Sequence, residues 1–194
     1  MEKTVQLKDG TEVCIRPLRK DDIDRSLAFF RALPLEDRLY LRKNVTRIEV
    51  IMERIRDIEL NNVRRLVALS GDEIVADGAL ELEGHGWKEH MGELRVIVAR
   101  RFQRKGVGLN MMRELYLLAV SEKVDELVVK MMDPQIAARK IVERLGFIED
   151  GKLTKYVRDI QGERHDLIVM RCDLNSAWNT LDEYFTDTDW ERRK

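Results

Sequence analysis

The spacing of apolar residues changes along the chain, and each change predicts a different kind of element. Residues 11–17 alternate between polar and apolar positions and end at a proline, which favours a first strand. Residues 23–33 and 48–58 repeat apolar side chains at intervals of three and four, as amphipathic helices do. Thr46 and Glu49 form a capping-box pattern, so we expect the second helix to begin there.

The middle of the chain has the shorter spacing of strands. Apolar runs at 66–69 and 74–80 flank the turn-like segment SGDE at 70–73, which predicts a hairpin. A third strand is expected at 93–99, after a polar loop that contains His85 and His90. These histidines are candidates for a substrate gate, with plain exposed loop residues as the alternative.

From residue 93 onward, strands and helices alternate. A helix follows the glycines at 106 and 108, a strand is expected at 127–129, and Gly146 ends a further helix. Two last strands, at 156–158 and 167–170, flank a hairpin-type loop at 159–163. The inward-facing residues of the two helices would be Leu109, Met112, Tyr116, Ala119 and Val120 in the first, and Ala138, Ile141, Val142 and Leu145 in the second.

This order of elements predicts an α/β fold with one mixed sheet, in the order β-α-α-β-β-β-α-β-α-β-β, containing a parallel pair with a right-handed crossover. We expect one domain over residues 1–174 and an acidic, aromatic tail over 175–194. Trp178, Leu181 and Phe185 have helical spacing in this tail. A short helix docked on the domain is expected there, with a dimer contact or a frayed end as alternatives.

Composition narrows the function classes. Of 194 residues, 44% are hydrophobic and 37% are charged, as in a soluble globular protein with a densely charged surface. The chain has 35 basic and 36 acidic residues, so its surface as a whole is not built to bind nucleic acid. A basic site must therefore be local. No apolar run approaches the roughly 18 residues of a membrane helix. We therefore expect a cytoplasmic protein that binds neither membrane nor nucleic acid.

The two cysteines do not indicate a metal site. Cys14 and Cys172 lie far apart in strand-like segments, without CxxC or Cys/His spacing. We expect reduced core residues, with a catalytic thiol as the alternative, and no bound metal.

The segment FQRKGVGL at 102–109 carries the clearest chemical signal. Gln103, Arg104 and Lys105 precede two glycines one residue apart, between a strand and a helix. Backbone N–H groups converge at such a turn, and Gly106 and Gly108 have no side chain to block a close approach. An anion such as a pyrophosphate fits this cradle, whereas the alternative is that the glycines only serve packing. The spacing fits neither a Walker P-loop nor a dinucleotide fingerprint.

These residues carry a resemblance to a known family. QRKGVG at 103–108 is similar to the Q/R-x-x-G-x-G/A signature of the GNAT acetyltransferase superfamily, and it follows a strand of the L-x-V-x-V type. IVERLGF at 141–147 resembles the family's second cofactor segment. The resemblance covers about residues 10–174 and is nearest to bacterial protein-lysine acetyltransferase domains. It implies the GNAT acyl-CoA N-acyltransferase fold, with splayed parallel central strands.

The resemblance also implies where acetyl-CoA would lie. Its pantetheine arm would pair with the third predicted strand as if it were another strand, and its pyrophosphate would bind the N–H groups of residues 104–109. A main-chain N–H near Val98 would meet the oxyanion of the thioester carbonyl. The cofactor-binding residues implied in this way are Val96, Ile97, Val98, Gln103, Arg104, Lys105, Gly106, Val107, Gly108, Leu109, Gln135 and Ala138.

Glu93 is the candidate catalytic residue. Transfer of an acetyl group to an amine needs a base, because a lysine-type ammonium has a pKa near 10.4. The resemblance implies a glutamate base at the start of this strand, where Glu93 stands. The alternative for Glu93 is a solvated strand-end carboxylate that pairs with Arg95.

Two positions depart from the family pattern. Gln135 stands where many members have asparagine, and Val142 stands where many have a tyrosine that protonates the leaving thiolate. Val142 cannot donate a proton, so Tyr156 and Tyr116 are the candidates for that role. Arg101 is a candidate contact of the adenosine 3'-phosphate.

The expected function is acetyl-CoA-dependent transfer of an acetyl group to a primary amine, either a protein lysine or a small molecule. A non-catalytic sensor of acyl-CoA is the alternative that the missing tyrosine motivates. A purely structural interaction protein is a third, and a homodimer is compatible with each.

Overall fold

The computed structural model describes residues 2–60, 62–82, 86–180 and 183, which fold around one mixed sheet. The eight strands lie in the order β1-β2-β3-β4-β5-β6-β8-β7. Every neighbouring pair is antiparallel except β5 and β6. The strands are β1 (Lys3–Gln6), β2 (Glu12–Pro17), β3 (Val63–Ser70), β4 (Glu73–Leu82), β5 (Met91–Val98), β6 (Glu126–Met132), β7 (Ile148–Arg158) and β8 (Arg164–Asp173).

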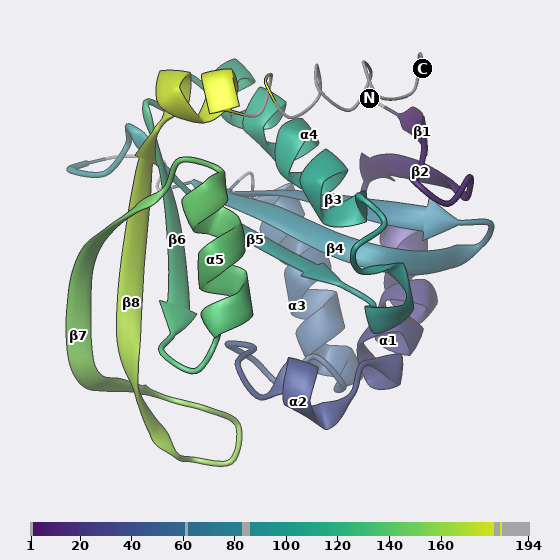
Figure 1. Ribbon diagram of the computed structural model, residues 1–194. Coiled ribbons are helices and arrows are strands. Elements are labelled where there is room, and N and C mark those ends of the chain that lie inside the picture. The colour runs from purple at the N-terminus through teal and green to yellow at the C-terminus, as the bar shows by residue number, and fades with distance from the viewer. Residues whose placement is uncertain (1, 61, 83–85, 181–182, 184–194) are drawn as a thin grey trace.

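Helices cover both faces of the sheet. Figure 1 shows α4 and α5 on the near face and α1 and α3 behind the sheet. The helices are α1 (Ile23–Ala32), α2 (Leu35–Arg38), α3 (Ile48–Glu59), α4 (Val107–Ser121) and α5 (Ile136–Arg144), and 3-10 turns form at Lys20–Asp22 and Arg100–Phe102.

Each face has its own core. On the near face, Leu80 and Leu94 from the sheet pack with Met111 and Leu115 from α4. Here Gly78 lets the helix approach closely, because a Cβ at this position would lie 2.8 Å from Met111 Cε. The α4 helix therefore rests directly on the centre of the sheet, and this contact fixes where its N-terminus points.

On the far face, apolar side chains of α1 and α3 cover the end of the sheet nearest the β3–β4 turn. Phe30 and Ile51 pack on Val67 there. Farther along the same face, the strands carry charged residues instead, and these residues form part of the candidate site described below.

The centre of the sheet opens between β5 and β6. The two strands pair only over Met91 to Glu93, which lie opposite Glu126 to Val128. Beyond Glu93 they part, and Figure 1 shows β5 and β6 running in different directions. The rest of β5 remains paired with β4 on its other edge. A fork between parallel strands is therefore present at the position that the sequence resemblance implied.

The fold class predicted from sequence is confirmed, with two additional elements. The strand β1 and the short helix α2 were not predicted, and β7 and β8 extend well beyond the expected 156–158 and 167–170. Most of β7 is exposed, so its many polar residues hide the alternation that normally reveals a strand.

Several local predictions were wrong. Thr46 does not cap the second helix; its hydroxyl donates to Asn44 Oδ1 at 2.6 Å, and α3 begins after Arg47. Val120 and Ile141, expected to face inward, are 49% and 57% exposed. A helical position at the edge of an apolar stripe points to the core only if a neighbouring element covers it, and sequence spacing does not reveal this.

The beginning of the predicted tail is helical over residues 174–180. Ala177 is buried, and the ring of Trp178 stacks on Tyr116 with centroids 5.3 Å apart. This part of the tail packs on the domain, while Leu181 and Phe185 lie outside the described residues. None of the helices in the described residues is both long enough and apolar enough to span a bilayer.

Candidate active site

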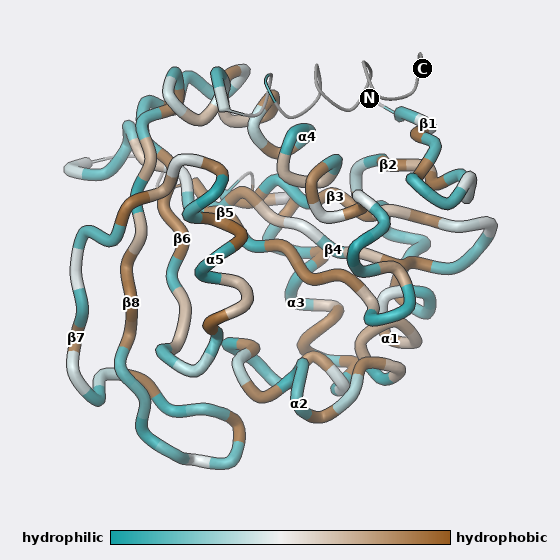
Figure 2. The backbone as a smooth tube through the Cα atoms, viewed as in Figure 1, coloured by the Kyte–Doolittle hydropathy of each residue, from teal (hydrophilic) through white to brown (hydrophobic). Residues whose placement is uncertain are grey.

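A cleft of about 1300 Å³ opens at the fork between β5 and β6. One wall is formed by the free edge of β5, the glycine turn and the start of α4, and another by β6 and α5. The α1–α3 side of the sheet and the segment after α2 line the rest. Figure 2 shows that β5 is largely hydrophobic and that the loop that follows it is hydrophilic.

The glycine turn presents open backbone donors to this cleft. Gly106 has φ of +98° and is the N-cap of α4, a left-handed conformation that favours glycine. Within the described residues, the backbone N–H groups of residues 104–109 donate to no backbone or side-chain acceptor. A Cβ at Gly108 would make only an ordinary contact with Val98, so packing does not demand this second glycine. The turn therefore has the geometry of an anion cradle.

Side chains before the glycines support the turn. Gln103 Nε2 donates to the Val98 carbonyl at 3.0 Å, and this bond ties the loop to the end of β5. Lys105 Nζ lies 2.8 Å from Asp9 Oδ2. This bond, together with the Thr11 N–H, lowers the pKa of Asp9 to about 2. Arg104 has a positive φ of 61° and, like Lys105, lines the cleft.

The cofactor-binding residues expected from sequence come together at the cleft, with one exception. Val107 is fully buried in the core beneath α4, so only its backbone N–H belongs to the turn. The other residues of that set all line the cleft: Val96, Ile97, Val98, Gln103, Arg104, Lys105, Gly106, Gly108, Leu109, Gln135 and Ala138.

Glu93 lies at the point where β5 and β6 part, and its side chain is only 14% exposed. Lys130 Nζ is 2.7 Å from its Oε2, Arg42 contacts its Oε1, and Arg95 Nε lies 3.9 Å from the same oxygen. Arg42, Arg95 and Lys130 line the cleft and cover the carboxylate, and Glu93 itself is not among the described residues that line it. The alternative prediction for Glu93 was a solvated carboxylate that pairs with Arg95. The contact with Arg95 is present, but the carboxylate is largely shielded from solvent.

Charged residues from several strands continue this layer on the α1–α3 side of the sheet. Arg54 of α3 donates from Nη2 to both carboxylate oxygens of Asp77 at 2.7 Å. Arg95 pairs with Glu81, and Arg65 of β3 lines the cleft nearby. Among the described residues that line the cleft, lysine and arginine outnumber aspartate and glutamate by twelve to five. The cleft is thus strongly basic in a chain whose net charge is -1.

Comparison with known proteins identifies this architecture. The model of the acetyltransferase (GNAT) family matches residues 29–147, which is more than half of the chain. The chain belongs to this family. The match spans the fork, the glycine turn and the helix that follows.

One curated GNAT relative is similar over part of its length. The chain is 28% identical over 91 residues to the N-alpha-acetyltransferase 30 of Xenopus laevis. The matched region is 46% of this chain and 33% of the relative, so the chain spans about a third of the length of that protein.

Solved structures resemble the GNAT fold of this chain over most of its length. The ribosomal-protein-alanine N-acetyltransferase of Brucella melitensis has a TM-score of 0.70 and 22% identity, covering 82% of this chain and 98% of that one. RimJ of Mycobacterium smegmatis, solved with CoA-disulfide, has a TM-score of 0.74 and 14% identity, covering 94% and 93%. At these identities the likeness concerns the fold.

Both departures from the usual GNAT pattern have a visible structural setting. Gln135 Oε1 accepts a hydrogen bond from the Met132 N–H at 2.8 Å, which holds the turn between β6 and α5. Val142 is 8% exposed and packs in the core while touching the cleft. Its apolar side chain offers no proton donor at this point of the GNAT cleft.

The tyrosines proposed from sequence as proton donors do not lie in the cleft. Tyr116 is buried and donates to the Leu174 carbonyl, and burial raises its pKa to about 12. Tyr156 is 68% exposed on β7. Sequence reasoning missed Tyr40, which follows α2, lines the cleft and meets the ring of His165 edge-on.

The remaining sequence candidates lie elsewhere. Arg101 pairs with Glu73 and does not line the cleft. His90 is exposed, and its carbonyl accepts the N–H groups of Asp125 and Glu126; His85 lies outside the described residues. Burial raises the pKa of the Cys172 thiol to about 11, and Cys14 is partly buried, as expected of unreactive structural cysteines.

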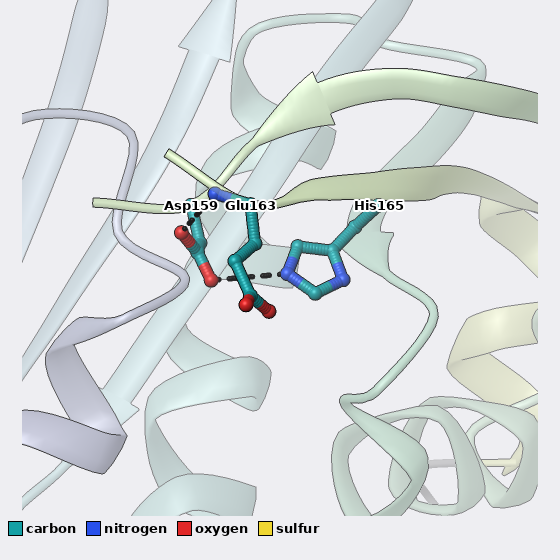
Figure 3. Close-up of side chains that lie close together, drawn as sticks. All are labelled: Asp159, Glu163 and His165. Carbon is teal, nitrogen blue, oxygen red and sulfur yellow. Dashed lines mark hydrogen bonds and ion pairs between the residues drawn. The ribbon is translucent and has the colours of Figure 1, made fainter. Parts of the chain in front are cut away.

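One cluster of potential metal ligands occurs in the described residues. Asp159, Glu163 and His165 lie together where β7 turns into β8 (Figure 3). Asp159 Oδ1 accepts the N–H groups of Gln161 and Glu163, and its Oδ2 lies 3.0 Å from His165 Nε2. Closing the hairpin accounts for this arrangement, since the bonds use both carboxylate oxygens of Asp159.

Proposed function

We propose that this GNAT protein is an acetyl-CoA-dependent N-acetyltransferase that acts on a primary amine. The observation that carries the proposal is the row of unpartnered N–H groups at residues 104–109, at the mouth of a cleft that also contains the free edge of β5. Family membership supports binding of an acyl-CoA, as does the fold it shares with a neighbour solved with CoA-disulfide. The acceptor is a protein lysine or a small-molecule amine.

The cofactor would occupy the fork as an additional strand. Its pyrophosphate would accept hydrogen bonds from the N–H groups of residues 104–109, with Arg104 and Lys105 supplying positive charge. The pantetheine amides would pair with the free edge of β5 over Val96, Ile97 and Val98, which is unpaired beyond Glu93. Gln135 and Ala138 would form the opposite side of the channel. This placement aims the thioester at the point where β5 and β6 separate.

Glu93 is the proposed general base. The neutral amine attacks the thioester carbonyl carbon, the carbon–sulfur bond breaks, CoA leaves as a thiolate, and the amine proton passes to Glu93 directly or through water. Because cations surround Glu93, an incoming ammonium would have to displace one of them to reach its carboxylate. A main-chain N–H of β5 beside the thioester would stabilise the oxyanion. CoA thiolate is a tolerable leaving group, so this scheme does not require a tyrosine at the position of Val142.

Release of free CoA thiol from acetyl-CoA in the presence of a pool of amines tests the proposal. Glu93→Gln should slow this release by about 100-fold or more, while the Kd for acetyl-CoA stays within about threefold. Glu89→Gln is the control, since this residue is exposed before β5. Equal rates for both variants would remove the base role from Glu93.

A non-catalytic sensor is the second candidate, because Val142 leaves no proton donor at its place and cations cover Glu93. A sensor would bind acetyl-CoA and raise its own melting temperature without releasing thiol to any amine. A catalyst would do both. Absence of any thermal shift with acetyl-CoA would exclude both candidates at once.

A further inference from the structure

Arg65 is a buried cation that forms no ion pair with any carboxylate of the described residues. Arg65 is 6% exposed, and it is one of the residues that line the cleft on the α1–α3 side. Nε is fully buried and donates to no acceptor, and in the described part of the chain no carboxylate forms an ion pair with this guanidinium. Buried charges are normally paired, because desolvation otherwise costs much free energy. An unpaired guanidinium facing a cleft therefore indicates a missing anion.

The neighbouring charges do not supply that anion. Asp77 gives both oxygens to Arg54, and Glu81 is shared between Arg95 and Arg42. Asp57 of α3 lines the cleft, but no hydrogen bond or ion pair to Arg65 is formed. Burial, followed by repulsion from Arg54, lowers the pKa of Arg65 to about 10. The charges of Asp77 and Glu81 attract this guanidinium without an ion pair to it, so they offset its charge only in part.

The sheet register places Arg65 within reach of the reaction centre. Arg65 lies opposite Ala79, and Ala79 lies opposite Arg95, so the three residues share one face of the sheet. Glu93 lies two residues from Arg95 on the same face. With neighbouring strands about 4.8 Å apart, Arg65 lies two strands, or roughly 10 Å, across the sheet from β5. One small molecule can therefore contact Arg65 and the fork together.

We propose that the acceptor is a small amine that carries a carboxylate, and that Arg65 binds this carboxylate while the amine faces Glu93. The proposal rests on the proposed function of the cleft. A single unpaired guanidinium matches the single charge of a carboxylate in a planar, two-bond contact, whereas a phosphate monoester brings nearly two charges. A polyamine would meet Arg42, Arg54, Arg65 and Arg95 instead, and like charges would repel it.

Matched pairs of amines test this inference without relying on turnover. Calorimetry with the CoA-saturated wild-type protein compares 4-aminobutyrate with butylamine, and L-lysine with cadaverine, which differ only in the carboxylate. We expect the carboxylated member to bind at least tenfold more tightly in at least one pair. No preference in either pair would overturn the proposal.

Variants locate the effect at Arg65. In Arg65→Gln the preference should fall to about twofold or less, and Arg65→Lys should recover part of it, because the charge returns without the planar fork. Arg64→Gln is the matched control: the adjacent arginine pairs with Glu122, outside the cleft, and the preference should persist. An undiminished preference in Arg65→Gln would refute the assignment. Unchanged acetyl-CoA affinity verifies that the variants are folded.

Turnover separates this inference from the proposed function. If carboxylated amines bind preferentially but no thiol is released, the N-acetyltransferase proposal fails and the carboxylate site stands. If amines are acetylated with equal kcat/KM whether or not they carry a carboxylate, the N-acetyltransferase proposal is supported and the proposed carboxylate site at Arg65 is refuted.

Discussion

The two walls of the cleft are built in different ways. The wall at the glycine turn uses backbone groups of one continuous segment, residues 94–109, and its side chains mainly hold the turn in place. The wall on the α1–α3 side uses side chains that three strands and a helix bring together, with Arg54, Arg65, Asp77 and Arg95 among them. Because the first wall consists of backbone groups, it suits a chemical group that all members of a ligand class share. The second can change residue by residue, so it is the wall to which we assign acceptor preference in our proposal.

The largest expected effect tests whether the side-chain wall is a desolvated network. Asp77→Asn removes the charge that neutralises Arg54, with side chains that are 7% and 11% exposed. Breaking a buried pair of this kind should lower the free energy of unfolding by about 3 to 5 kcal/mol. Urea denaturation measures it.

Asp72→Asn is the matched control for that change. Asp72 pairs with Arg25 on the surface, where its side chain is 99% exposed. Its loss should cost under about 1 kcal/mol. Equal effects of the two substitutions would mean that water, not protein, surrounds the Asp77 pair.

A carboxylate in the backbone wall should weaken cofactor binding next in order of size. Gly106→Asp places negative charge and a strained side chain among the N–H groups of residues 104–109, so the Kd for acetyl-CoA should rise about 100-fold or more. Gly162→Asp, at φ of +90° in the β7–β8 turn, carries similar strain outside the cleft. Undiminished affinity in Gly106→Asp, measured by calorimetry, would rule out the cradle.

The packing of α4 on the sheet, which supports the backbone wall, can be tested separately from cofactor binding. Gly78→Val would displace the buried side chains that α4 packs on the sheet, because a Cβ would lie 2.8 Å from Met111 Cε and 3.0 Å from Leu115 Cδ1. Overpacking of this kind should destabilise the protein by about 1 to 3 kcal/mol. Gly151→Val on β7 meets nothing within 4 Å and should be nearly neutral. Thermal denaturation of both variants compares them.

The smallest expected effect concerns the ion pair between Lys105 and Asp9, beside the glycine turn. Lys105→Ala removes the main cause of the lowered Asp9 pKa, which should rise from about 2 toward the ordinary 3.8. A lowered carboxyl pKa favours the fold above pH 3.8, and this contribution is lost as the pH falls through 2. Titration of the Asp9 carboxyl by NMR measures the change, and acetyl-CoA affinity should fall only a few-fold. A constant Asp9 pKa would show that Lys105 does not set it.

The two walls were not equally predictable from sequence. The turn could be predicted because Gly106, Gly108 and the preceding strand are adjacent in the chain, and their conformation follows from local rules. Arg65, Asp77 and Arg95 could not be grouped, because their proximity depends on the register of β3, β4 and β5. A signal was present: charged residues interrupt strands that are otherwise apolar. Without the register, that signal does not reveal which charges pair.

The pairing of Glu93 illustrates the same limit. The sequence predicted it at the start of its strand, two residues later than β5 begins, and its contact with Arg95 followed from their spacing. Its contact with Lys130 requires that β5 and β6 be parallel and aligned at Glu93 and Val128. Its contact with Arg42 requires the loop after α2 to reach back over the sheet. Long-range geometry, which local patterns do not encode, therefore sets the electrostatic environment of the candidate base.

The short junction between β5 and β6 has a mechanical consequence. Within the described residues, strand pairing joins the β1–β5 half of the sheet to the β6–β8 half at three positions, Met91, Gly92 and Glu93. A ligand that binds along the facing edges of β5 and β6 would connect the two halves of the sheet. Its arrival should stiffen the two halves against each other, which would appear as slower amide hydrogen exchange on strands that the ligand never touches.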